Sequence, residues 1–200
     1  MMSEMRLPAV SQAEDILNQA QLSNSGKWVS HCKIAAECAE AIARQTNSLN
    51  GEAAYVMGLL HDIGRKDGVV DMLHIIRGYE YMHSLNYDSV ARICLTHSFP
   101  DKNILSYNGV NDCSGSQTEF IRSYIENVEY SDYDRLIQLC DALALPEGAT
   151  FIEKRLVEVA LRRGVNSYTL EKWKAFLELK DYFEKMTNKS IYNIIGVSVF

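Results

Sequence analysis

The sequence predicts an all-α protein, and three features support that fold class. Only 3 prolines occur in 200 residues, and proline is the residue that most strongly interrupts helices. Two S-x-x-E capping boxes, Ser11 with Glu14 and Ser116 with Glu119, indicate helix starts. No segment alternates polar and apolar residues over the length of a strand. We therefore expect a compact helical fold without a sheet.

Helices are predicted where apolar residues recur at steps of three and four. In chain order these are about 11–23, 27–46, 51–63, 70–85, 88–97, 116–128, 132–145, 150–163 and 169–187. The segment Phe99–Ser116 is rich in Asn, Asp, Ser and Gly, which predicts a long loop. Loops of that length are often lids or binding loops.

Two helices carry a clear apolar stripe. In 27–46 the stripe consists of Trp28, His31, Ala35, Cys38 and Ile42. In 169–187 it consists of Trp173, Phe176, Leu177, Phe183 and Met186. We expect both stripes to face the core, and we assign no chemistry to the second one.

Composition limits the location and the partners of the protein. With 200 residues and 47% apolar content, we expect one domain over residues 1–200. The formal charge of -6 disfavours extended nucleic acid and anionic membranes as partners. The five cysteines lack CxxC spacing and have mostly apolar neighbours, as reduced thiols do. No signal peptide or membrane helix is visible, so a cytoplasmic location is expected.

Asp141 is the first candidate for chemistry. The helix Leu136–Leu145 is apolar except at Gln138 and Asp141, which places the carboxylate on an apolar element. A buried carboxylate must be hydrogen-bonded, paired with a charge or bound to a metal. A structural cap or ion pair is the alternative to a metal site.

The histidines follow apolar runs or lie on apolar faces. His61 and Asp62 end the run "AAYVMGLL", and we expect Gly64 to stop that helix in a left-handed conformation. A metal ion that lies beside His61 and Asp62 would bind both side chains as ligands. His83 is rotated about 180° from His74 on their helix, so it is assigned a structural or exposed role. Each histidine alone would more often be structural.

Together, these residues form a candidate metal-ligand set of four imidazoles and two carboxylates. The set is His31, His61, Asp62, His74, His97 and Asp141. Six donors exceed what one tetrahedral zinc ion takes, but they suit two ions such as iron or manganese.

The order H, HD, D resembles the HD superfamily of metal-dependent phosphohydrolases over about residues 27–145. Its members here are His31, His61–Asp62 and Asp141, and "LLHDIGRKDG" is similar to the HD-I-G-K turn of that family. "HIIRGYE" with His74 and "LTHSF" with His97 resemble the two further histidines of the dinuclear branch. That branch includes the symmetrical diadenosine tetraphosphate hydrolases and the HD-GYP phosphodiesterases.

This resemblance implies a helical HD-domain fold, and we expect the C-terminal helices at about 150–187, which lie outside it, to pack on its core. It also implies two divalent metal ions held by the six residues, with Asp62 bridging. Iron or manganese is expected, with zinc, magnesium, nickel or cobalt as alternatives. Where relatives often have a lysine after the glycine, this chain has Arg65 and then Lys66. Either base can bind phosphate, or both can lie on a solvated helix end.

We therefore expect hydrolysis of a phosphoester or phosphoanhydride in a small, nucleotide-like substrate. A metal-bridging hydroxide would attack, Asp62 would orient it as the catalytic residue, and Arg65 or Lys66 would neutralise the phosphate. One alternative is a single-metal 5′-nucleotidase that uses only the H, HD and D residues. Another is a non-catalytic, metal-stabilised nucleotide sensor. A homodimer is compatible with the sequence.

Overall fold

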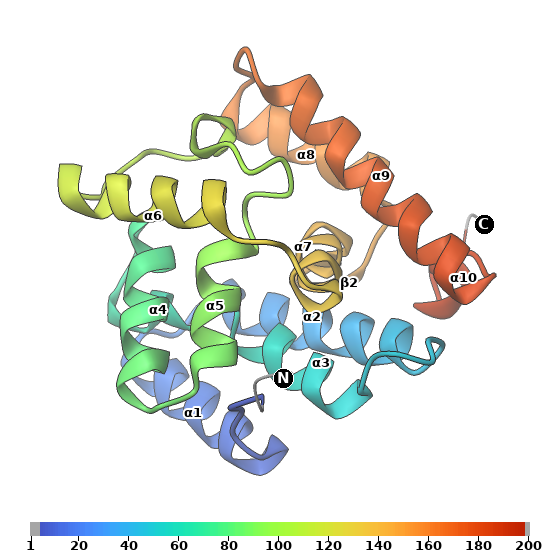
Figure 1. The fold of residues 1–200 in the computed structure, drawn as a ribbon, viewed down its shortest axis with the longest axis horizontal. Coiled ribbons are helices and arrows are strands. Elements are labelled where there is room, and N and C mark those ends of the chain that lie inside the picture. The colour runs from blue at the N-terminus through green and yellow to red at the C-terminus, as the bar shows by residue number, and fades with distance from the viewer. Residues whose placement is uncertain (1–4, 199–200) are drawn as a thin grey trace.

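The computed structural model describes residues 5–198, and these form the predicted all-α fold (Figure 1). The α-helices of this range are α1 (Val10–Ser23), α2 (Lys27–Ala43), α3 (Gly51–Leu60), α4 (Leu73–Ser84), α5 (Asp88–Thr96), α6 (Gly115–Asn127), α7 (Asp132–Leu143), α8 (Ile152–Arg163), α9 (Thr169–Thr187) and α10 (Ile191–Ile194). All but α10 were predicted, with ends within three residues of those observed.

Four short elements were not predicted. The 3-10 helices are η1 (Ile63–Asp67) and η2 (Ile104–Ser106), the latter inside the predicted loop. Strands β1 (Ala144–Leu145) and β2 (Gly148–Ala149) pair antiparallel directly after α7. A strand of two residues is too short to show alternation of polar and apolar residues, so this pair was not predicted.

Both predicted capping boxes are displaced by about one half-turn. Ser11 lies inside α1, whose N-cap is Ala9. Ser114 rather than Ser116 caps α6, because its hydroxyl accepts a hydrogen bond from the amide of Gln117 at 3.2 Å. The prediction was wrong because glutamine in the third position closes a capping box as glutamate does.

The helices that carry the ligands lie between the two ends of the molecule. Figure 1 shows α8 and α9 side by side at one end and α1 near the other, with α7 between the C-terminal pair and the helices α2 and α3. α2 packs along α3 and α7, while α4 packs along α5 and η1. α7 also contacts α8 and α9, so the C-terminal helices pack on the helix that carries Asp141.

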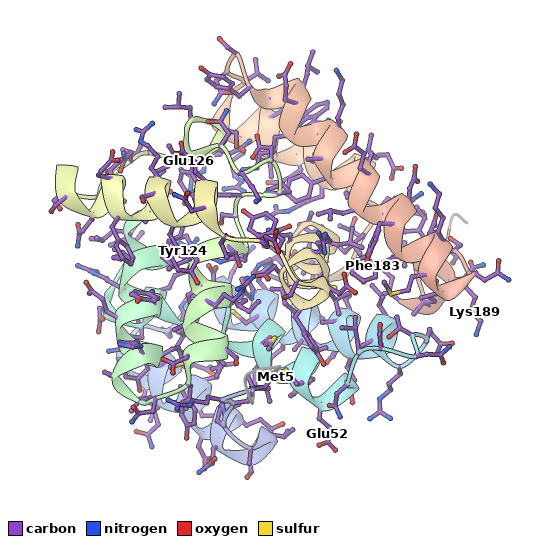
Figure 2. All side chains as sticks on the ribbon, viewed as in Figure 1. Met5, Glu52, Tyr124, Glu126, Phe183 and Lys189 are labelled. Atoms are coloured by element: carbon purple, nitrogen blue, oxygen red, sulfur yellow. The ribbon has the colours of Figure 1, made fainter. Side chains whose placement is uncertain are left out.

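The core consists of three apolar clusters that hold these helices together. One cluster joins α2, α3 and α7 to the C-terminal helices, a second joins α1 to α2 and α3, and a third joins α4, α5 and α6. Phe183 of α9, labelled in Figure 2, is fully buried in the first cluster. Burying one such aromatic side chain contributes about 2–3 kcal/mol to stability.

The buried face of α9 differs from the predicted stripe at two positions. Phe176 and Phe183 are buried as expected, but Leu177 is 39% exposed and Leu179 is buried instead. Lys172 lies on the same buried face, four residues before Phe176. The stripe prediction passed over Lys172 because it considered only apolar residues.

Within residues 5–198, no helix has both the length and the apolar character needed to cross a bilayer. The single domain expected over residues 1–200 stays a prediction, and residues 1–4 and 199–200 of it lie outside the described range.

Candidate metal centre

Four histidines and two aspartates form one cluster in the interior of the molecule. They come from α2, the ends of α3 and α5, α4 and α7. Five of them are at most 8% exposed, and Asp141 is partly buried. The cluster contains every metal ligand that the sequence predicts: His31, His61, Asp62, His74, His97 and Asp141.

The end of α3 explains how two adjacent side chains reach the cluster. α3 ends at Leu60, His61 keeps helical angles, and Asp62 leaves them with φ -103° and ψ 15°. Asn50 starts this helix by accepting a hydrogen bond from the amide of Ala53 at 2.9 Å. The chain therefore turns within the HD dipeptide itself.

Gly64 serves a different purpose from the one that the sequence suggests. It does not adopt a left-handed conformation, and Gly68 at the end of η1 has the positive φ, 126°. A Cβ atom on Gly64 would lie 1.9 Å from the carbonyl oxygen of His74. Gly64 is thus required because η1 and α4 touch through their backbones, and this contact sets His74 beside Asp62.

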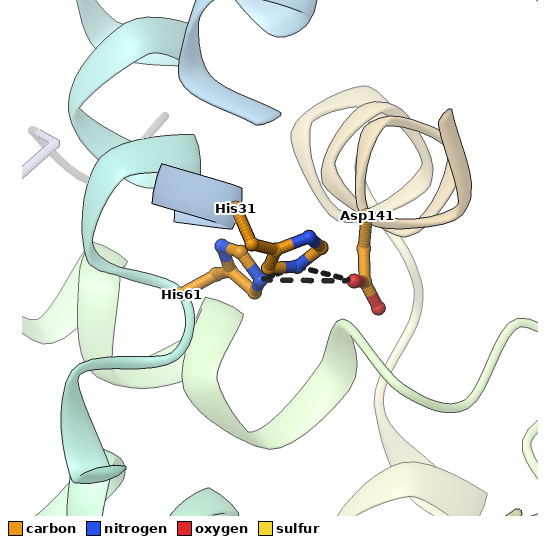
Figure 3. A group of neighbouring side chains, drawn as sticks. All are labelled: His31, His61 and Asp141. Atoms are coloured by element: carbon orange, nitrogen blue, oxygen red, sulfur yellow. Dashed lines mark hydrogen bonds and ion pairs between the residues drawn. The ribbon is translucent and has the colours of Figure 1, made fainter. Parts of the chain in front are cut away.

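The first group of candidate ligands is His31, His61 and Asp141, whose side chains point toward one another in Figure 3. Asp141 Oδ1 lies 2.9 Å from His31 Nε2 and 3.8 Å from His61 Nε2. The two Nε2 atoms are 3.3 Å apart. All three donor atoms could contact one cation after small shifts.

The second group is His61, Asp62 and His97, and it shares His61 with the first. His74 adjoins this group, because its Nε2 lies 2.9 Å from Asp62 Oδ1 and 3.4 Å from His97 Nε2. Asp62 Oδ1 is also 3.5 Å from His97 Nε2. His61 thus links the two groups, and Asp62 Oδ1 faces both His74 and His97.

All four imidazole rings are oriented in the same way. Each Nδ1 contacts a backbone carbonyl, which can only accept a hydrogen bond, so Nδ1 carries the proton in the neutral ring. The carbonyl partners are Ala144 for His31, Gly58 for His61, Asp71 for His74, and Ile93 and Cys94 for His97. Each Nε2 atom therefore faces the cluster, and its lone pair is free for a metal ion when the ring is neutral, as in the metal sites of many proteins.

The two carboxylates are anionic at neutral pH. Burial alone would raise the pKa of Asp62, but Arg65 and His74 hold that pKa well below its usual value. Burial likewise opposes ionisation of Asp141, but the hydrogen bond with His31 and the charges of the neighbouring histidines together lower the pKa of Asp141. Two carboxylates and neutral imidazoles suit iron, manganese or zinc, so the donor set fits a divalent cation.

The pKa shifts of His31, His61 and His74 differ in direction. Burial lowers the pKa of His61 to about 4 and also lowers the pKa of His74, which keeps both rings neutral at pH 7. Burial would do the same for His31, but Asp141 raises the pKa of His31 above its usual value. A cation at the first group would compete with that proton.

Arg65 and Lys66 differ in where their charges lie. Arg65 Nε donates to Asp62 Oδ2 at 2.6 Å, and its guanidinium lines the cavity described below. Lys66 Nζ contacts Asp67 at 2.8 Å and lies 4.5 Å from the centre of the Tyr81 ring. Lys66 is not among the residues that line the cavity. His83 is exposed and contacts Asp88 at 2.7 Å, consistent with the role assigned to it.

A cavity of about 670 Å³ opens beside the cluster. Five of the six candidate ligands line it, and α8 and α9 supply much of the opposite wall. The remaining ligand, His61, has a fully buried side chain behind the others. A cavity of this volume is typical of sites for small molecules.

Sequence reasoning missed the residues that α8 and α9 contribute to this cavity. They are Arg155, Leu156, Glu158, Val159, Arg162, Arg163, Lys172, Trp173 and Phe176. Helical periodicity could have identified Lys172, because a lysine four residues before a buried phenylalanine lies on the same face. The bases of α8 carry no comparable signal.

Comparison with known proteins gives one finding. The family model described as HD domain matches residues 28–145, which is more than half of the chain and includes all six candidate ligands. No curated protein and no solved structure matches the chain. The matched range ends with the last residue of β1, so α8 and α9 lie beyond it.

Proposed function

The chain belongs to the HD domain family, and from this premise we propose that it is a metal-dependent phosphohydrolase with two metal ions. The observation that carries the proposal is the common orientation of the four imidazoles, whose Nε2 atoms converge on two carboxylates. A purely structural cluster has no need to aim four Nε2 atoms at the same two carboxylates.

Two metal ions suit the cluster better than one. His31, His61 and Asp141 would hold the first ion, while Asp62, His74 and His97 would hold the second. His61 belongs to both groups and Asp62 follows it directly in the chain, which supports Asp62 as the shared carboxylate. Metal ions in such a site supply an acidified water and positive charge next to phosphoryl oxygens.

Asp62 is the residue that we assign to orienting the attacking water. Its pKa is held low, so its carboxylate stays anionic and can accept a hydrogen bond from the water. Arg65 fixes one oxygen, Oδ2, which leaves Oδ1 on the side of His74 and His97. The orientation of the Asp62 carboxylate is thus fixed by Arg65 in the absence of a substrate.

Arg65 is the residue that we assign to the phosphate. Its Nε is engaged by Asp62 and its Nη1 by the Val70 carbonyl at 3.0 Å. Within residues 5–198 no hydrogen-bond partner contacts Nη2, and the guanidinium lines the cavity. A phosphate oxygen there would receive a charge-assisted hydrogen bond. The position of Lys66 supports no such assignment.

A small, nucleotide-like substrate fits the cavity. Its volume can enclose a molecule of that size, and Trp28, Trp173 and Tyr107 line it. Aromatic side chains offer surfaces on which a base can stack, typically worth about 1–3 kcal/mol.

The test is metal analysis of the purified protein, followed by a phosphate-release screen with manganese or iron. The screen covers nucleoside mono- and diphosphates and dinucleoside polyphosphates. We expect about two metal equivalents per chain, about one after His97→Ala, and two after the control substitution His83→Ala.

Two results would contradict the proposal. About one equivalent that survives both His74→Ala and His97→Ala would instead indicate the single-metal 5′-nucleotidase. Nucleotide binding without phosphate release from fully loaded protein would indicate the non-catalytic sensor.

A further inference from the structure

Six cationic side chains line the cavity, and five of them have a carboxylate partner within ion-pair distance. The pairs are Lys27–Glu147, Arg65–Asp62, Arg155–Glu158, Arg162–Glu158 and Arg163–Asp71. Lys172 has no such partner among residues 5–198. Its charge is therefore the one that the cavity wall leaves without a counterion.

Lys172 is also the most buried of these cations, with 6% of its surface exposed. Its Nζ donates one hydrogen bond, to the carbonyl of Ser106 at 3.2 Å, and lies 5.9 Å from the centre of the Tyr107 ring. An ammonium group has three donors, so two remain for a ligand. A buried charge that lacks a counterion costs stability, and an anionic ligand in the cavity would supply the missing counterion.

The protonated form of Lys172 persists at neutral pH. Burial lowers its pKa to about 8, although the carboxylates of Asp101 and Asp141 act in the opposite direction. Lys172 and five of the six candidate ligands line the same cavity. An anion in the cavity can therefore interact with both at once.

We propose that Lys172 binds a second phosphate group of the substrate, distinct from the phosphate that Arg65 and the metal centre receive. This inference rests on the proposed function, and it selects substrates with at least two phosphates, such as nucleoside diphosphates. The two cations belong to different elements, because Arg65 lies on η1 and is bonded to Asp62, whereas Lys172 lies on α9 and contacts none of the six ligands. They can serve two separate anionic groups.

The probe is methylenediphosphonate, a diphosphate analogue that resists hydrolysis, compared with inorganic phosphate. Binding to metal-loaded protein is measured by titration calorimetry without free metal. The wild type is expected to prefer the diphosphonate by at least tenfold. Lys172→Met should weaken diphosphonate binding roughly 10- to 100-fold, the usual effect of losing one charged hydrogen bond, and change phosphate binding less than threefold.

Two matched variants complete the experiment. Lys172→Arg should keep most of the diphosphonate affinity because it keeps the charge. Lys174→Met removes an exposed lysine from the same helix and should bind both anions as the wild type does. Metal content, measured for every variant, should be unchanged because Lys172 touches no ligand.

Three outcomes would overturn the inference. They are wild-type protein without a preference for the diphosphonate, Lys172→Met with unchanged diphosphonate binding, and equal weakening of both anions. The first needs no variant, so a variant that fails to fold leaves the test intact. Diphosphonate binding that depends on Lys172 without any phosphate release would contradict only the hydrolase proposal, and phosphate release that is insensitive to Lys172→Met would contradict only this one.

Discussion

At the scale of single residues, Asp62 has two oxygens in two different environments. Oδ2 lies 2.6 Å from Arg65 Nε, and Oδ1 lies 2.9 Å from His74 Nε2. The carboxylate therefore links a cation that the chain supplies to the position where a metal ion would bind. Removing its charge should affect both sides.

We expect Asp62→Asn to lose bound metal and to reduce phosphate release by at least about a thousandfold, because a shared anionic ligand disappears. The metal-free variant should also be less stable by a few kcal/mol, since Arg65 stays partly buried without its counterion. Metal analysis, kinetics and urea denaturation measure the three effects. Asp67→Asn, at the exposed end of η1, is the control. Full metal content in Asp62→Asn would contradict the assignment.

Lys172 gives a prediction for the dependence of stability on pH. Its pKa falls from 10.5 to about 8 in the folded protein, so between these pH values the unfolded chain binds a proton that the folded protein lacks. Stability from this residue therefore rises with pH across that window. Lys172→Met should be more stable than the wild type below pH 8, and this advantage, a few kcal/mol, should vanish toward pH 10.5.

Urea denaturation of both proteins from pH 7 to 10.5 measures this difference, with Lys174→Met as the control that should show no trend. The groups that face the ammonium are the Ser106 carbonyl, the Tyr107 ring, and the carboxylates of Asp101 and Asp141 at longer range. A constant difference between wild type and Lys172→Met over the whole range would contradict the depressed pKa.

At the scale of elements, the contact between η1 and α4 fixes the geometry of the cluster. Gly64→Ala would place a methyl group against the His74 carbonyl and the amide of Gly78, both of which are backbone. We expect a loss of about 3 kcal/mol or more in the free energy of unfolding, together with weaker metal binding as His74 moves. Gly115→Ala, where no atom lies within 4 Å of the added carbon, is the control. Stability within 0.5 kcal/mol of the wild type, roughly the level of a neutral surface change, would contradict this.

Most helices could be predicted because apolar periodicity is a local property of the sequence. The exact start of α6 could not, since Ser114 and Ser116 are equally good caps by composition. The role of Gly64 could not either, because it depends on α4, which follows later in the chain. Apolar periodicity within one segment gives no information about the contacts between elements.

The six candidate ligands could be named from the sequence because polar residues on apolar helices are conspicuous, and the family resemblance supplied their grouping. The α8 and α9 wall of the cavity could not be named. Arg155 and Arg162 look like ordinary solvated bases, and only the packing of α8 and α9 on α7 turns them toward the cavity. The exception is Lys172, whose spacing to Phe176 places it on the buried face of α9, but the predicted stripe included only apolar residues.

At the scale of the whole molecule, the candidate ligands join five segments that are separated along the chain. A cation that binds only the folded protein therefore stabilises the entire core. Saturating manganese should raise the unfolding temperature by about 5–10 °C, since 100-fold saturation contributes about 2.7 kcal/mol and 1 kcal/mol shifts a protein of this size by about 2–4 °C. Scanning calorimetry with and without chelator measures the shift. Asp62→Asn should show little of it, and no shift in the wild type would contradict a metal centre.

The candidate metal ligands and the cavity wall that carries Lys172 come from different segments of the chain. All six candidate ligands precede β1, whereas the wall that carries Lys172 follows β2. Changes in α8 and α9 can therefore alter which anion is accepted without altering the donor atoms at the other side of the cavity. In evolution, or in a chimaera that exchanges α8 and α9, substrate preference and metal chemistry can be inherited independently.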